Sequence, residues 1–232
     1  MRVLLVAATQ QEVGLMISHF ELTALRASPF STSNLDIPNI YSLTTHNSQL
    51  TTIITGVGMV ATAFSLGKHL ATNQYDLAIN LGIAGSFDRS IALGEVVEIV
   101  EDSLSEFGAE DDNSFLTIDE LGFGEGNLKA TTSLSALGNF NLKQVKAITI
   151  NTVHGNEQSI KKLTDRIQPQ LESMEGAAFF YACNQVGVPC LQIRAVSNYV
   201  EKRNRDAWQI RLAIKNLNSF AADLIKQLQV VS

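Results

Sequence analysis

Residues 77–86 have the sequence LAINLGIAGS, an apolar run followed by a run of small residues. The first half, Leu77–Leu81, has the continuous hydrophobicity of a strand that is covered on both faces of its sheet. The second half, Gly82–Ser86, is expected to form a loop at the carboxyl end of that strand. Because ligands of open α/β sheets bind outside the carboxyl ends of the strands, this loop is a candidate binding site.

Similar apolar segments recur along the chain and alternate with helical patterns. The predicted strands are Val3–Ala7, Thr52–Thr55, Leu77–Leu81, Val96–Val100, Ala147–Ile150 and Leu191–Ala195. The predicted helices are Val57–Thr72, Glu157–Arg166, Met174–Val186 and Ala207–Gln229. This order predicts an α/β fold, a three-layer αβα sandwich with a mostly parallel mixed sheet, built as a single domain over residues 1–232. Ser28–Asn39 is expected to be an irregular connection, and Ser103–Leu142 a long excursion.

The composition agrees with a large core. The chain has 232 residues, of which 45% are hydrophobic and 17% are charged, so it can fold without disulfide or metal staples. Cys183 and Cys190 belong to no Cys/His cluster and are expected to be reduced thiols, and no metal or cofactor is expected. The start of the chain has no signal-peptide pattern and no apolar stretch could span a bilayer, which predicts a cytoplasmic protein without a membrane partner.

The net charge of −6 is unevenly distributed. The stretch Ser90–Leu128 contains no Lys or Arg and many acids, which disfavours nucleic acid as a partner. Four cations instead gather near the C-terminus, at Lys202, Arg203, Arg205 and Arg211. This basic cluster is either a solvated surface or a pocket for a small anionic group.

Two glycines follow the second predicted strand, in the pattern Gly56-Val57-Gly58-Met59-Val60-Ala61. The pattern matches a dinucleotide-binding fingerprint, which also needs an acid at the end of the next strand. That strand ends at Leu81-Gly82 without one, so close backbone approach or tight packing is the preferred interpretation of the two glycines. Glu175 is predicted in the first turn of a helix, where an acid can be a partner of the helix dipole or a functional group.

Four motifs together resemble those of the nucleoside phosphorylase/hydrolase superfamily. They are Gln11-Glu12-Val13, Gly82–Ser86, Ser173–Ala178 and Arg194–Asn198. Within the superfamily, Leu191–Glu201 is similar to the futalosine hydrolases, nucleosidases that remove hypoxanthine from futalosine in an alternative menaquinone pathway. The resemblance implies an enzyme that cleaves the N-glycosidic bond of a nucleoside and that forms a homodimer or a larger homo-oligomer.

The resemblance also assigns roles to residues. Glu12 matches the general base, which would accept a proton from the attacking water. Glu175 matches the acid that accepts hydrogen bonds from the ribose hydroxyls, and Met174 would offer an apolar surface beneath the sugar. The other substrate-binding candidates in the matching motifs are Ala84, Gly85 and Ser197.

Asn198 departs from the pattern of the methylthioadenosine nucleosidases, which have an Asp there as the acid toward purine N7. An Asn has no titrating proton, but its amide can accept from a protonated N7 while its NH₂ group donates to an oxygen on C6. This favours a 6-oxopurine such as hypoxanthine over adenine, and it leaves water as the source of the proton for the departing base.

Futalosine has a carboxyphenyl ketone in place of the ribose 5′-hydroxymethyl group, so its enzyme needs a cation beyond the sugar. Arg203 and Arg205 are the candidates, together with Tyr199 and Trp208 as an apolar wall. Water is preferred over phosphate as the nucleophile, because the Glu12 carboxylate would oppose a phosphate dianion. Arg194 is either a phosphate ligand or the partner of a buried acid such as Glu175.

Three alternatives stay open. The first two are a methylthioadenosine/S-adenosylhomocysteine nucleosidase and a purine nucleoside phosphorylase. The third is a nucleotide-binding sensor domain that has the fold without turnover.

Overall fold

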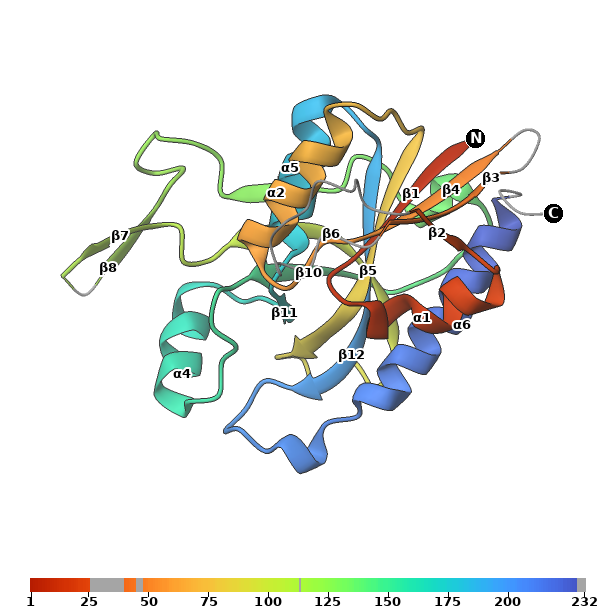
Figure 1. Ribbon diagram of the computed structural model, residues 1–232. Helices are drawn as coiled ribbons and strands as arrows, with labels where there is room; N and C mark the ends of the chain where they lie inside the picture. The colour runs from red at the N-terminus through yellow and green to blue at the C-terminus, as the bar shows by residue number, and fades with distance from the viewer. Residues whose placement is uncertain (26–39, 45–47, 113, 229–232) are drawn as a thin grey trace, which may run out of the picture.

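The computed structural model describes residues 1–25, 40–44, 48–112 and 114–228 (Figure 1). The predicted irregular connection Ser28–Asn39 lies outside the described residues. None of the helices in the described ranges combines the length and the apolar character that a membrane crossing requires.

Four parallel strands form the centre of the sheet, in the order β12-β5-β1-β4. Their bounds are Arg2–Ala7 for β1, Gln49–Ile54 for β4, Leu77–Ser86 for β5 and Cys190–Tyr199 for β12. Beyond β4, the antiparallel strands β3 (Ile40–Thr44) and β2 (Thr23–Leu25) complete one edge. The sheet is therefore mixed and belongs to an α/β fold, as predicted.

The other half of the sheet curls back on itself. Strand β6 (Val96–Leu104) runs antiparallel to β12 and is followed in the sheet by β10 (Gln144–Thr149) and β11 (Leu171–Ser173), which are parallel to it. Strand β11, the last strand in this direction, also pairs antiparallel with β5 of the central group. Strand β9 (Asn127–Lys129) pairs with β6. This return places β11 beside the carboxyl end of β5.

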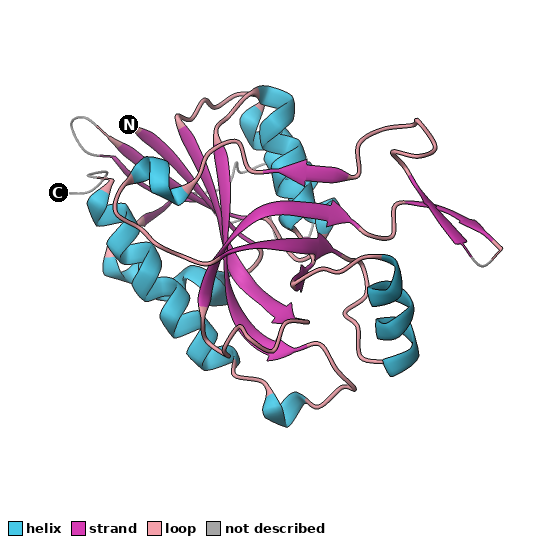
Figure 2. Ribbon diagram, turned by 180° about the vertical axis from the view of Figure 1, so that it is seen from behind, coloured by secondary structure: helices cyan, strands magenta, loops and turns pink. Residues whose placement is uncertain are grey.

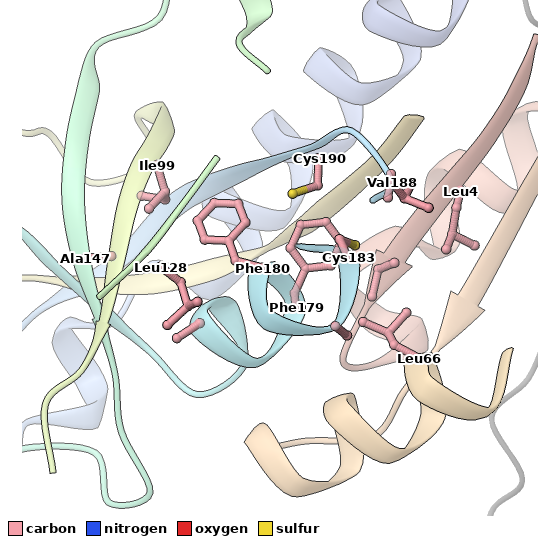
Figure 3. Close-up of a cluster of buried hydrophobic side chains, with 14 of the residues drawn as sticks. Leu4, Leu66, Ile99, Leu128, Ala147, Phe179, Phe180, Cys183, Val188 and Cys190 are labelled. Atoms are coloured by element: carbon pink, nitrogen blue, oxygen red, sulfur yellow. The ribbon is translucent and has the colours of Figure 1, made fainter. Parts of the chain in front are cut away.

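Two helix pairs cover the two faces of the sheet (Figures 1 and 2). Helices α1 (Gln10–His19) and α6 (Ile210–Gln227) pack together on one face, and α2 (Met59–Leu70) and α5 (Gly176–Val186) on the other. Strand β1 is apolar from Val3 to Ala7 because successive side chains enter different cores. Leu4 and Val6 face α2 and α5, whereas Val3, Leu5 and Ala7 face α1 and α6. Figure 3 shows part of the first core, in which Phe179 and Phe180 of α5 belong to one cluster with Leu66 of α2 and Leu128 of β9. The free thiols of Cys183 and Cys190 are buried in it.

The smaller elements lie around this frame. Helix α4 (Glu157–Arg166) has the predicted bounds. The predicted helix Ala207–Gln229 begins later, as α6 at Ile210, and Ala207 instead ends the short 3₁₀ turn η1 (Arg205–Ala207). Gln229 lies outside the described residues. The predicted excursion Ser103–Leu142 contains the end of β6, the hairpin β7 (Gly108–Asp111) and β8 (Ser114–Thr117), β9, and the helical turn α3 (Leu134–Leu137). The hairpin projects away from the body of the molecule (Figure 1).

Two predicted strands continue beyond the carboxyl ends expected for them, Leu81 and Ala195. Gly82–Ser86 is not a loop but the second half of β5, and Val196–Tyr199 continues β12. The small residues serve close packing rather than a turn, because a Cβ at Gly82 would overlap the guanidinium of Arg194. The chain after β1 enters α1, a helix that was not predicted, and Glu12 lies in its first turn.

Candidate active site

A cavity of about 300 Å³ opens at the carboxyl ends of β5 and β12, between α1, β11 and the start of α5. A volume of this size is at the lower end of that seen for small-molecule sites. Of the site residues predicted from sequence, its walls contain Glu12, Ala84, Gly85, Met174, Glu175, Ser197 and Asn198, but not Tyr199, Arg203 or Arg205. Segments far apart in the chain thus meet at the carboxyl ends of the strands, where ligands of open α/β sheets bind.

Glu12 is a buried carboxylate held at the N-terminus of α1. Its Oε2 accepts hydrogen bonds from the N–H and the hydroxyl of Thr9, at 2.9 and 3.1 Å, and its Oε1 accepts one from the N–H of Ile83 at 3.2 Å. Burial raises the pKa of Glu12, while the positive charge of Arg194 opposes that rise. The result is a fixed carboxylate whose pKa lies above that of an exposed Glu.

Glu175 lies at the N-cap position of α5, one residue before the helix begins, and it is buried. Its Oε1 accepts a hydrogen bond from the N–H of Gly58 at 3.0 Å. Gly58 has a φ of 94°, a conformation that favours glycine, at the start of α2. The glycines after β4 therefore form a close backbone contact with the candidate site, in line with the preferred interpretation, and Gly56 is packed against Ala61.

Arg194 is 1% exposed and lies between the two acids. Its Nη2 is 3.9 Å from Glu175 Oε2, which is the buried ion pair that the sequence suggested as one of two roles. The same Nη2 donates to Gln192 Oε1 at 3.0 Å. Arg194 thus partly balances the negative charge of Glu12 and Glu175 inside an apolar sheet.

Behind Arg194 a buried polar network continues to Asp102 of β6. Gln192 Nε2 donates to Asp102 Oδ2 at 2.9 Å, and the Thr149 hydroxyl donates to Asp102 Oδ1 at 2.7 Å. Burial raises the pKa of Asp102 to about 6 despite these two donors. Thr149 also accepts a hydrogen bond from the N–H of Ala177, so the network is connected to the first turn of α5.

Ser197 and Asn198 both face the cavity, although consecutive strand residues normally point to opposite faces. The reason is an irregularity in the register of β12 against β5 between Val196 and Asn198, which acts as a bulge. The Ser197 hydroxyl donates to Asn198 Oδ1 at 2.8 Å, and Asn198 Nδ2 donates to the carbonyl of Tyr199 at 3.1 Å. These contacts orient the amide at the cavity wall.

The apolar part of the cavity includes Met174, which packs with Phe87, Ile148 and Ile150. Trp208 also lines the cavity, and the Arg203 guanidinium lies over its ring at 5.3 Å from the centroid. Arg203 and Arg205 themselves lie outside the cavity lining, so their contact with a substrate stays a prediction. Tyr199 is not in the lining either and instead packs under Arg89.

One acid of the cavity was missed in the sequence. Glu172 of β11 is 3% exposed and lines the cavity wall. Its Oε2 is 2.6 Å from His154 Nδ1, and its Oε1 accepts a hydrogen bond from the N–H of His154 at 3.2 Å. The signal that could have identified it is its position, directly before the Ser173–Ala178 motif and three residues before Glu175. His154 is therefore a loop histidine whose hydrogen-bond partner belongs to the site.

Comparison with known proteins places the chain among nucleoside-processing enzymes. It matches the phosphorylase superfamily over residues 2–228. It is 30% identical to the futalosine hydrolase of Thermus thermophilus, over 70% of this chain and 75% of that protein. It is 27% identical to the 5′-methylthioadenosine/S-adenosylhomocysteine nucleosidase of Colwellia psychrerythraea, over 74% of this chain and 76% of that protein. Among solved structures, the native futalosine hydrolase of Helicobacter pylori has the same fold, with a TM-score of 0.80 at 15% identity over 98% of this chain and 96% of that chain.

Proposed function

This chain belongs to the phosphorylase superfamily, and from that premise we propose that it is a futalosine hydrolase. It hydrolyses the N-glycosidic bond of futalosine and releases hypoxanthine and dehypoxanthine futalosine, a step of menaquinone biosynthesis. The observation that carries the proposal is the presence of Glu12, Glu175 and Asn198 in the wall of one cavity. The identity to the Thermus thermophilus enzyme supports the choice of substrate.

Glu12 acts as the general base. Its Oε1 receives a single hydrogen bond, from the N–H of Ile83, and keeps a lone pair for the attacking water. As the bond between ribose C1′ and purine N9 breaks, the water oxygen bonds to C1′ and its proton passes to the Glu12 carboxylate. The raised pKa of Glu12 makes it a better proton acceptor than an exposed carboxylate.

Glu175 binds the ribose. The reaction develops positive charge on the sugar ring, which a nearby carboxylate stabilises more strongly in the transition state than in the substrate. Gly58 fixes one oxygen of Glu175, and Arg194 lies near the other without forming a short ion pair. The carboxylate therefore has acceptor capacity left for the ribose hydroxyls.

Asn198 binds the departing base. It donates to O6 of hypoxanthine and accepts from N7–H once the departing base has been protonated there, and that proton comes from water because an amide does not titrate. An adenine-releasing nucleosidase, favoured by the identity to the Colwellia psychrerythraea enzyme, is the second candidate. Asn198 makes it the weaker one, since the 6-amino group of adenine would face the amide NH₂.

The test is chromatography of futalosine, inosine, methylthioadenosine and adenosine after incubation with the protein, with and without phosphate. We expect free hypoxanthine from futalosine without phosphate, and little release from the two adenine nucleosides. A requirement for phosphate would contradict hydrolysis, and adenine released from methylthioadenosine alone would favour the second candidate.

The active form is a homo-oligomer in this proposal. Helix α2 and the segment just before it expose Val57, Val60 and Phe64, with relative exposures of 57%, 79% and 71%. An apolar strip of this kind is typical of a surface that another subunit covers. Light scattering coupled to size-exclusion chromatography should give at least a dimer, and Phe64→Glu should shift it toward the monomer. A monomeric wild-type protein would contradict this part of the proposal.

A further inference from the structure

Glu172 and Asn198 occupy one row of the sheet, on either side of Gly85. Strand β11 pairs with β5 at Glu172 and Gly85, and β12 pairs with β5 at Asn198 and Gly85. Residues paired in register across neighbouring strands project from the same face of the sheet. The acid and the amide therefore flank the position where Gly85 has no side chain.

The contacts around Gly85 agree with this arrangement. A Cβ at residue 85 would lie 3.1 Å from Asn198 Nδ2 and 3.4 Å from Glu172 Cγ. Both side chains line the cavity. Glycine thus leaves a narrow space with a carboxylate on one side and a carboxamide on the other, which suits the polar edge of a planar ring.

The Glu172 carboxylate has hydrogen-bonding capacity beyond what the protein uses. It accepts two hydrogen bonds, both from His154, one to each oxygen. An ionised carboxylate offers about four acceptor positions, so roughly two remain. With Glu172 ionised, His154 Nδ1 must carry its hydrogen, which leaves the acid with acceptors only.

We infer that Glu172 determines base specificity by accepting a hydrogen bond from N1–H of a 6-oxopurine while Asn198 binds O6 and N7. The inference rests on the proposed function, because it names how that site selects its base. Hypoxanthine carries a hydrogen on N1, whereas N1 of adenine is a lone pair that a carboxylate repels. The cavity would therefore favour the first base and reject the second.

Glu172 adds what Asn198 alone does not supply. A carboxamide has both a donor and an acceptor, so what Asn198 presents to a base depends on the orientation that Ser197 and the Tyr199 carbonyl give it. An ionised carboxylate has no donor at all and therefore presents only acceptors, whatever its orientation. A site built to pair a polar group rejects an analogue that leaves the group unpaired far more strongly than a merely apolar site does.

The competing explanation is that Glu172 only anchors the loop at His154. The two explanations differ in what Glu172→Gln changes. Gln keeps an oxygen for the N–H of His154, and its NH₂ group can donate to the other tautomer of the ring, so the loop can stay in place. A structural role then affects all bases equally, whereas a role in specificity affects only bases with N1–H.

The experiment measures binding of free hypoxanthine and of 1-deazahypoxanthine, in which N1–H is replaced by C–H, by isothermal titration calorimetry. The proteins are the wild type, Glu172→Gln and the matched control Glu98→Gln. Glu98 is also buried, but it binds the N–H of Leu134 and the amide of Gln144 outside the cavity. We expect the wild type and the control to prefer hypoxanthine by at least about tenfold, and Glu172→Gln to lose most of that preference.

An unchanged preference in Glu172→Gln, or equal weakening for both bases, would overturn the inference. Release of hypoxanthine from futalosine by the wild type is measured in parallel and tests only the proposed substrate. If the wild type cleaves futalosine but the preference survives in Glu172→Gln, the inference fails alone. If the preference is lost as expected but futalosine is not cleaved, the substrate proposal fails and the role of Glu172 in base recognition stands.

Discussion

The Arg194 guanidinium crosses the backbone of Gly82 so closely that residue 82 can have no side chain. A Cβ there would overlap Arg194 Nη1 and would lie 3.0 Å from Glu12 Oε1. Gly82 thus leaves room for the Arg194 guanidinium, the cation that lies between Glu12 and Glu175. A backbone position in the middle of a strand is in this way part of the candidate active site.

Gly82→Ala should consequently damage both folding and catalysis. Overpacking at this position should lower the free energy of unfolding by about 1–3 kcal/mol, because Arg194 or the strand must shift. The control is Gly67→Ala in α2, where a Cβ meets nothing within 4 Å. It should be neutral or slightly stabilising. Urea denaturation and kcat/KM for futalosine check both variants, and equal behaviour of the two would contradict the close contact at Gly82.

Much of the site could be predicted because its residues lie at strand ends that an alternating β/α pattern brings together. Met174, Glu175, Ser197 and Asn198 come from two such segments and meet in the cavity. Glu172 could not be predicted in the same way. Its strand β11 has three residues and pairs with β10 in one direction and β5 in the other, a long-range arrangement without a local sequence pattern.

Helix α1 was missed for a different reason. Its mixed polar and apolar residues include Gly14, so helical periodicity is weak there. A local signal was nevertheless present, since Thr9-Gln-Gln-Glu12 has the spacing of a capping box. In the structure Thr9 is the N-cap, and its N–H donates to the Glu12 side chain. Glu12 therefore combines a contact that starts the helix with a place in the cavity wall.

Glu12→Gln should remove the general base while leaving the shape of the cavity unchanged. We expect kcat to fall by about 10²–10⁴ while KM changes little, because the amide keeps the shape but accepts no proton. Glu98→Gln, a buried substitution outside the cavity, should retain activity. A variant at Glu12 with nearly full kcat would contradict its role as general base.

The pH dependence of the wild type tests the same residue independently. Only the ionised form of Glu12 can accept a proton, and burial raises its pKa above the ordinary value of 4.5. Activity should therefore be lost as pH falls through a value above 4.5, and kcat/KM should be constant at higher pH as far as Glu12 is concerned. Steady-state rates over the acidic range check this, and an acid limb at or below 4.5 would contradict the raised pKa.

Asp102 should make folding stability depend on pH. Its pKa is about 6 in the folded protein, above the ordinary value of about 3.9 expected for the unfolded chain. The Asp102 carboxyl group then holds its proton more tightly in the folded state than in the unfolded state. Asp102 therefore stabilises the fold below about pH 4, and this stabilisation is lost as pH rises through 6. As pH rises from about 4 to above 6, the unfolding free energy of the wild type should fall relative to that of Asp102→Asn. A difference that does not change with pH would show that Asp102 has an ordinary pKa.

Arg203→Glu tests the predicted recognition of the substrate carboxylate. Arg203 lies over Trp208, which lines the cavity, so the charge at this position is near its mouth. Charge reversal should raise KM for futalosine about three- to tenfold, and should leave KM for inosine unchanged because inosine has no carboxylate. Lys226→Glu makes the same charge change at the far end of α6 and should affect neither substrate. Equal effects of Arg203→Glu on both substrates would favour a surface role, and Arg205→Glu extends the comparison.

Asn198→Asp should shift specificity toward 6-aminopurines. A carboxylate at this position accepts from the amino group on C6 and repels O6 of hypoxanthine, and when protonated it can donate to N7. The ratio of kcat/KM for adenosine to that for inosine should rise at least about tenfold. Glu172 still opposes N1 of adenine in this variant, so the double substitution Asn198→Asp with Glu172→Gln should raise the ratio further. Competition assays with the paired nucleosides check both steps, and a ratio that does not move in Asn198→Asp would contradict the assignment of the base site to this residue.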